Sequence, residues 1–104
     1  MALMYELREV ERNGDCLFEC VAQWLHEHPY YAELTTSEAR GDIVDWLDKN
    51  RDARLVPTDP NSPVVKDRYN TDLYSSFQDY LTALKKPGIF GDFLAIYAAC
   101  QVFV

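Results

Sequence analysis

Apolar residues recur at helical spacing in the stretch that begins at Cys16. One face of this stretch is apolar and carries Leu17, Cys20, Val21, Trp24 and Leu25, whereas the other face is polar. Pro29 limits the length of the helix, because the residue before a proline disfavours the α region. The pattern therefore predicts a helix from Cys16 to about Glu27, with Trp24 in the core.

A second helix is predicted to begin at Thr35. Thr35 is followed three residues later by Glu38, the signature of a capping box. The apolar stripe that comes next has helical spacing and consists of Ala39, Ile43, Val44 and Leu47. We expect this stripe to pack against the Cys16 helix.

Two further helices are expected in the C-terminal half. The third is capped by Asn70 or Thr71, ends at Lys85 to Gly88, and has an apolar face formed by Leu73, Phe77, Tyr80, Leu81 and Leu84. The fourth follows Gly91, which permits a tight turn, and Asp92 caps it. Residues 101–104 begin a β-prone run and predict a strand.

Two segments show no helical period. Residues 48–70 contain three prolines, which exclude a continuous helix and predict a loop. Long loops in compact domains are often functional. Two roles are therefore considered for this loop: it contacts a substrate, or it is only a solvated connection between helices. Residues 4–11 alternate weakly and fit either a short strand or a short helix.

Composition indicates one globular domain, residues 1–104, with 48% hydrophobic residues and a formal net charge of −7. An acidic protein is repelled by nucleic-acid phosphates and by anionic membrane surfaces, so we expect neither as a partner. A basic protein partner is favoured. No run of about twenty apolar residues occurs, so no membrane span is expected.

The three cysteines, Cys16, Cys20 and Cys100, are odd in number and have no paired spacing. No secretory signal is recognised, so we expect the cytoplasm, or a host's cytoplasm if the protein comes from a pathogen. Cys16 and Cys20 lack a second pair of ligands, and the chain holds two histidines. We therefore expect no metal and no other cofactor.

The candidate chemistry lies in the turn before Cys16. Asn13-Gly14 is a turn dipeptide, and Asp15 is a favoured helix N-cap. Cys16 then occupies the first turn, where free amides and the helix dipole stabilise a thiolate. The amides of Gly14, Asp15 and Cys16 are candidate oxyanion donors. The alternative is a buried cysteine that acts as a small hydrophobic residue.

The run Asn13-Gly14-Asp15-Cys16-Leu17-Phe18 resembles the Asp-Gly-Asn-Cys-Leu-Phe signature of the ovarian tumour (OTU) family of cysteine proteases. The resemblance implies Cys16 as nucleophile and ubiquitin, or a ubiquitin-like protein, as partner; ubiquitin's C-terminal tail carries arginines. Asn13 stands where the family often has an aspartate near the active site. Arg40 matches an arginine near the start of a family helix, and we interpret it as structural.

A second, weaker match covers residues 89–100. The family has Trp-Gly-Gly followed by Glu-Leu and an alanine-rich helix; here Phe90, Asp92 and Ala95 replace the Trp, the second Gly and the Glu. The resemblance implies an α/β (α+β) papain-like OTU fold. In it the buried central nucleophile helix is surrounded by helices and by a small sheet that includes residues 102–104.

The family's catalytic histidine lies in a C-terminal part that this sequence lacks. His26 lies ten residues after Cys16, about 15 Å away along a helix, so neither His26 nor His28 can serve as its base. We expect either an incomplete deubiquitinase that hydrolyses isopeptide bonds to ubiquitin, or a catalytically inactive domain that binds ubiquitin or another protein. The unpaired edge of the terminal strand predicts self-association.

Overall fold

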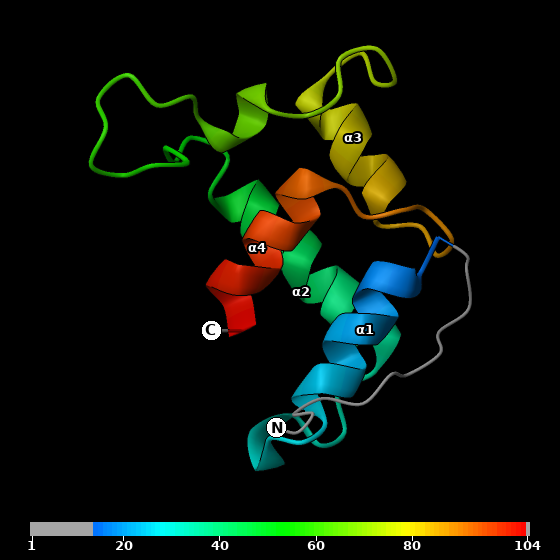
Figure 1. Cartoon of the computed structure of the whole chain (residues 1–104). Coiled ribbons are helices and arrows are strands. Elements are labelled where there is room, and N and C mark those ends of the chain that lie inside the picture. The colour runs from blue at the N-terminus through cyan, green and yellow to red at the C-terminus, as the bar shows by residue number, and fades with distance from the viewer. Residues whose placement is uncertain (1–13, 104) are drawn as a thin grey trace, which may run out of the picture.

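The computed structural model describes residues 14–103, and within this range the protein is built almost entirely from helices (Figure 1). In chain order these are α1 (Cys16–Leu25), the 3-10 helix η1 (Pro29–Tyr31), α2 (Thr36–Lys49), the 3-10 helix η2 (Val65–Asp67), α3 (Phe77–Leu84) and α4 (Phe93–Phe103). None of these helices is long and apolar enough to cross a membrane.

The predicted α/β papain-like fold with a small sheet is wrong for residues 14–103. The β contact there is an isolated antiparallel bridge between Arg54 and Val64, and no sheet is formed. The expected strand at 101–104 is replaced by the end of α4, which runs through Phe103. Val104 and the segment 4–11 lie outside the described residues.

Helix α2 is the centre of the fold. Helices α1, α3 and α4 all pack against it, and Figure 1 shows α1 and α4 lying along it. The stripe that the sequence predicted is confirmed, because Ala39, Ile43, Val44 and Leu47 are buried. The prediction that the Cys16 helix would be the buried central helix is wrong.

The start of α2 follows the predicted capping box. The side-chain hydroxyl of Thr35 accepts a hydrogen bond from the amide of Glu38 at 3.0 Å. The Glu38 carboxylate in turn accepts one from the amide of Thr35 at 3.2 Å. Two of the free amides at the helix N-terminus are thereby satisfied.

Helix α1 presents a different face to the core from the predicted one. It buries Phe18, Ala22 and Leu25. Leu17 and Val21 are partly buried, but Trp24 is 61% exposed, which contradicts the expected burial of its side chain. α1 is apolar on more than one side, so the packing of Phe18, rather than the pattern alone, decides which side faces α2.

Helix α3 begins later than predicted. Its N-cap is Ser76, whose hydroxyl accepts a hydrogen bond from the amide of Asp79 at 3.1 Å. Asn70 instead forms a local turn, because its side chain accepts a hydrogen bond from the amide of Asp72 at 2.9 Å. Leu73, expected in the apolar face, is 71% exposed.

Helix α4 begins as predicted. The Asp92 carboxylate accepts a hydrogen bond from the amide of Ala95 at 3.2 Å, and a second from the Tyr80 hydroxyl at 2.7 Å. Burial of Phe103 favours continuation of the helix over the β preference of the last residues. The strand edge that was the expected cause of self-association is therefore absent from residues 101–103.

The loop between α2 and α3 projects from the helices (Figure 1) and matches the predicted loop, although α2 extends to Lys49. The amide of Leu55 donates to the Pro63 carbonyl at 3.0 Å, and that of Val65 to the Ala53 carbonyl at 2.9 Å. The Tyr97 hydroxyl ties the loop to α4 by donating to the Leu55 carbonyl at 3.0 Å.

The exposure of Trp24 changes what its truncation is expected to do. We expect Trp24→Ala to lower the free energy of unfolding by less than about 1 kcal/mol, because the side chain is mainly in water. Leu47→Ala, at a fully buried position of α2, should lower it by roughly 2 to 5 kcal/mol. Urea unfolding measures both. A larger loss for Trp24→Ala than for Leu47→Ala would contradict this packing.

Candidate functional site at the Cys16 turn

The structure places Cys16 at the first residue of α1, where its side chain is partly exposed. The carbonyl of Asp15 accepts the first helical hydrogen bond, from the amide of Glu19 at 2.8 Å. A sulfur in this position is open to a reagent or substrate and lies at the positive end of the helix dipole.

Asp15 occupies the N-cap position of α1, as predicted, but its side chain forms no capping hydrogen bond. Its carboxylate binds Arg40 at 2.6 Å and accepts a hydrogen bond from the amide of Gly88 at 2.9 Å. The Gly88 amide and the Arg40 guanidinium lower the pKa of Asp15 below its ordinary value. Asp15 is thus a structural anion, bound by Arg40 and by the amide of Gly88, both of which lie far away in the sequence.

Arg40 is the centre of this site and is buried. Besides binding Asp15, its guanidinium donates to the carbonyls of Gly14 at 3.1 Å, Ile89 at 2.9 Å and Leu84 at 2.6 Å. The charge also lies 4.0 Å from the centre of the Phe18 ring. One side chain of α2 therefore fixes the turn before α1, the end of α3 and the segment that leads to α4.

The sequence did not predict this network, although it contains a signal for it. Arg40 follows Ala39 in the apolar stripe of α2, and a buried cation requires an anion and several acceptors. Asp15 was assigned to helix capping instead. The partner of a buried arginine is set by tertiary contact, which residue spacing does not give.

Glycines bring the two motifs of the sequence together. A Cβ atom on Gly14 would lie 1.5 Å from the carbonyl oxygen of Gly88, and one on Gly91 would lie 2.3 Å from a methyl carbon of Leu17. The Gly88 backbone leaves no room for a side chain at position 14, whereas the Leu17 methyl opposite Gly91 belongs to a side chain that can shift. The turn before Cys16 and the segment before α4 therefore lie side by side, as their joint attachment to Arg40 also requires.

The two histidines lie after the other end of α1, away from Cys16. A ring nitrogen of His26 lies 2.6 Å from the Leu34 carbonyl, and a ring nitrogen of His28 accepts a hydrogen bond from the Tyr30 amide at 3.2 Å. The length of α1, about 15 Å, separates them from Cys16. Neither can remove a proton from the Cys16 thiol.

The remaining predicted features have different outcomes. Cys20 is exposed, which contradicts its predicted place on the apolar face of the first helix, and Cys100 is exposed as well. Among residues 14–103, no group of three or more His, Cys, Asp or Glu side chains could hold a metal ion. Asn13 lies outside the described residues, and the oxyanion role of the Gly14 and Asp15 amides stays a prediction.

No protein-family model, curated protein or solved structure matches this chain. A functional assignment therefore depends on the Cys16 motif and on the geometry around it.

Loss of Arg40 should be strongly destabilising. We expect Arg40→Met to lower the free energy of unfolding by roughly 3 to 5 kcal/mol, because Asp15 and three carbonyls lose their donor together. Arg51→Met is the matched control: Arg51 forms an exposed ion pair with Asp48, a class worth about 0 to 1 kcal/mol. Thermal and urea unfolding report both losses, and similar values for the two variants would contradict the network.

The ionisation of Asp15 should make the free energy of unfolding depend on pH in the acid range. Its pKa is lower in the folded protein than its ordinary value of 3.8, so the unfolded chain binds a proton first as pH falls. The stabilisation that the Asp15 carboxylate provides is complete above about pH 5. It is lost as the pH falls through 3.8 towards the lower pKa that Asp15 has in the folded protein.

Replacement of this carboxylate tests the assignment. Asp15→Asn should be less stable than the parent at neutral pH, and the difference between the two should shrink below pH 3.8. The free energy of unfolding, measured at a series of pH values, gives the comparison. A difference that stays constant over this range would show that the Asp15 charge contributes nothing.

Proposed function

We propose that Cys16 is the nucleophile of a thiol hydrolase that cleaves isopeptide bonds to ubiquitin or a ubiquitin-like modifier. One observation carries the proposal: a partly exposed cysteine is the first residue of a helix, on a turn that the buried Arg40 holds in place. The resemblance of residues 13–18 to the OTU signature supplies the substrate class.

In the proposed reaction the Cys16 thiolate attacks the carbonyl carbon of the isopeptide bond. A carbon–sulfur bond forms, the carbon–nitrogen bond breaks, and the departing lysine amine takes a proton from a general acid. Water then hydrolyses the thioester and regenerates the thiol. The amides of Gly14, Asp15 and Cys16 are the proposed donors to the oxyanion of the tetrahedral intermediates.

The reaction also needs a base that accepts the thiol proton and returns it to the leaving amine. His26 and His28 cannot do so, and the Asp15 carboxylate is bound to Arg40. In this proposal the base is therefore a group other than these three side chains. The formal charge of −7 suits a basic substrate segment.

A ubiquitin-derived electrophile tests the proposal. We expect slow labelling of the chain, confined to Cys16, and no labelling of Cys16→Ala. Cys20→Ala is the matched control, because Cys20 lies one turn further along α1 and is exposed; it should be labelled at the parent's rate. Mass spectrometry of peptides identifies the modified residue, and adducts on Cys20 or Cys100 would contradict the assignment.

The rates of alkylation by iodoacetamide show whether the Cys16 thiol is activated or only accessible to the reagent. Cys20 and Cys100 are more exposed than Cys16, so exposure alone favours their alkylation. We expect Cys16 to react faster than either, because the start of α1 stabilises its thiolate. If the three rates follow exposure instead, Cys16 is not an activated nucleophile.

A second candidate function is a non-catalytic domain that binds ubiquitin or another protein. It is favoured by the lack of a histidine beside Cys16 in residues 14–103. This function predicts binding of ubiquitin, measured by chemical-shift changes on titration, that is unchanged in Cys16→Ala and leaves no covalent adduct with the probe.

A further inference from the structure

Positive charge is unevenly distributed along the chain. Residues 16–39, which form α1, η1 and the start of α2, contain no lysine or arginine, and helix α4, residues 93–103, contains no charged side chain. The acidic side chains of residues 16–39 are Glu19, Glu27, Glu33 and Glu38. The region where α1, η1 and α4 meet is therefore built from segments that carry negative charge or none.

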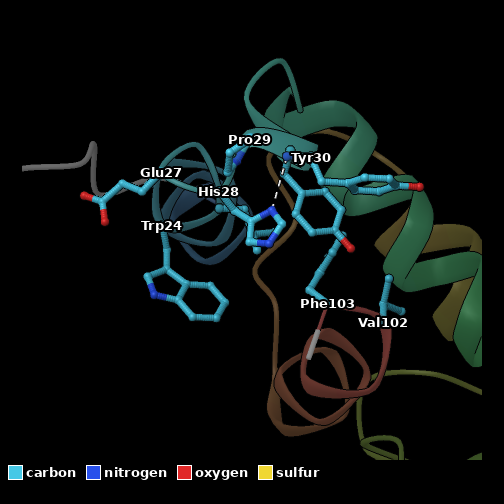
Figure 2. A pocket seen from close by; sticks show the side chains of 9 residues that line it. Trp24, Glu27, His28, Pro29, Tyr30, Val102 and Phe103 are labelled. Atoms are coloured by element: carbon cyan, nitrogen blue, oxygen red, sulfur yellow. Dashed lines mark hydrogen bonds between the residues drawn. The ribbon is translucent and has the colours of Figure 1, made fainter.

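A groove lies between the C-terminal ends of α1 and α4, beside η1. Its volume is about 560 Å³, within the range of roughly 300 to 1,000 Å³ that is usual for ligand pockets. Figure 2 shows the Trp24 ring on one side of this space and Phe103 with Val102 on the other, whereas Glu27 points away. Three elements contribute aromatic side chains to its lining, namely Trp24, Tyr30, Tyr31 and Phe103.

Tyr31 holds the aromatic wall of the groove together. Its ring packs edge to face against Tyr30, with 4.9 Å between the ring centres, and against the buried Phe103, with 5.6 Å. The Tyr30 amide donates to a ring nitrogen of His28 at 3.2 Å. A ring nitrogen that accepts a hydrogen bond carries no proton, so His28 adds no positive charge here. The rings of Trp24 and Tyr30 are 61% and 81% exposed, and are therefore accessible to a ligand.

We propose that this groove binds a small organic cation that carries a trimethylammonium group. Aromatic rings attract a cation through their negative faces, and sites lined by such rings recognise quaternary ammonium groups. The negative charge of residues 16–39 and the formal net charge of −7 attract a cation and repel an organic anion. A dry cavity of roughly 150 Å³ already binds benzene, so the groove has room for the trimethylammonium group and the part of the ligand attached to it.

This site is separate from the proposed nucleophile. Cys16 is the first residue of α1, whereas the groove is at the last turn of the same helix. Binding of the cation therefore does not depend on the hydrolase activity and can be tested in the chain as it stands.

The signals of the two tryptophan indoles test the proposal by nuclear magnetic resonance. Trp24 lines the groove, whereas Trp46 lies on α2 and packs against Tyr97. On titration with choline at constant ionic strength, we expect the indole N–H signal of Trp24 to shift and to saturate, and that of Trp46 to stay in place. A Trp24 signal that does not respond, or equal shifts of both signals, overturns the proposal.

A neutral analogue of choline separates attraction of the charge from recognition of an apolar shape. In this analogue a tert-butyl group replaces the trimethylammonium group, so the shape is kept and the charge is removed. We expect it to bind roughly tenfold more weakly than choline, because it gains nothing from the negative faces of the rings. Equal affinity for the two compounds would overturn the proposal.

Two substitutions at exposed aromatic residues locate the site. Trp24→Ala should weaken choline binding by roughly tenfold, measured on the backbone amide signals of residues 28–31. Phe90→Ala is the matched control, because Phe90 is 64% exposed and does not line the groove, and it should bind choline like the parent. An unchanged Trp46 signal shows that each variant is folded. Parent-like affinity in Trp24→Ala, or an equal loss in both variants, would contradict binding in this groove.

Discussion

The buried guanidinium of Arg40 is the constraint on which the rest of this structure depends. Removing a cation from water is costly, and the cost is offset only if an anion and further acceptors surround it. Asp15 and the carbonyls of Gly14, Leu84 and Ile89 meet this requirement. Because these acceptors lie in separate parts of the chain, α2 can bury Arg40 only when α1, the end of α3 and the segment before α4 are assembled around it.

This constraint also determines what the Cys16 turn can do. The turn is held from two sides, by Arg40 and by the close approach of Gly14 to Gly88, so Cys16 has a defined position before any substrate arrives. Preorganisation of this kind favours catalysis, because fixed groups need no rearrangement in the transition state. The same contacts engage Asp15, which cannot then act as a base for the thiol. These contacts thus fix the position of the sulfur, and in the proposed reaction a group other than Asp15 must transfer the proton.

Local signals in the sequence predicted local structure well. The capping box of Thr35 and Glu38 and the cap at Asp92 each depend on residues three positions apart, and both are present. The side of α1 that faces the core was predicted wrongly, because Phe18 and Trp24 are both apolar and only the surface of α2 selects between them. The sheet was inferred from a family resemblance and a β-prone run at 101–104, and neither of these accounts for the surface that α4 buries on α2.

Helix α4 shows why that run was misread. A continuous apolar stretch fits either a strand buried on both faces of a sheet or a helix buried on all sides, and periodicity cannot separate the two. In both structures the apolar surface has to be buried against more than one neighbouring element. The chain forms the helix, and one side of it is buried against α2. Phe93, Ile96 and Cys100, on another side, are exposed. The apolar composition therefore fits both structures, and the surface that α4 buries on α2 decides in favour of the helix.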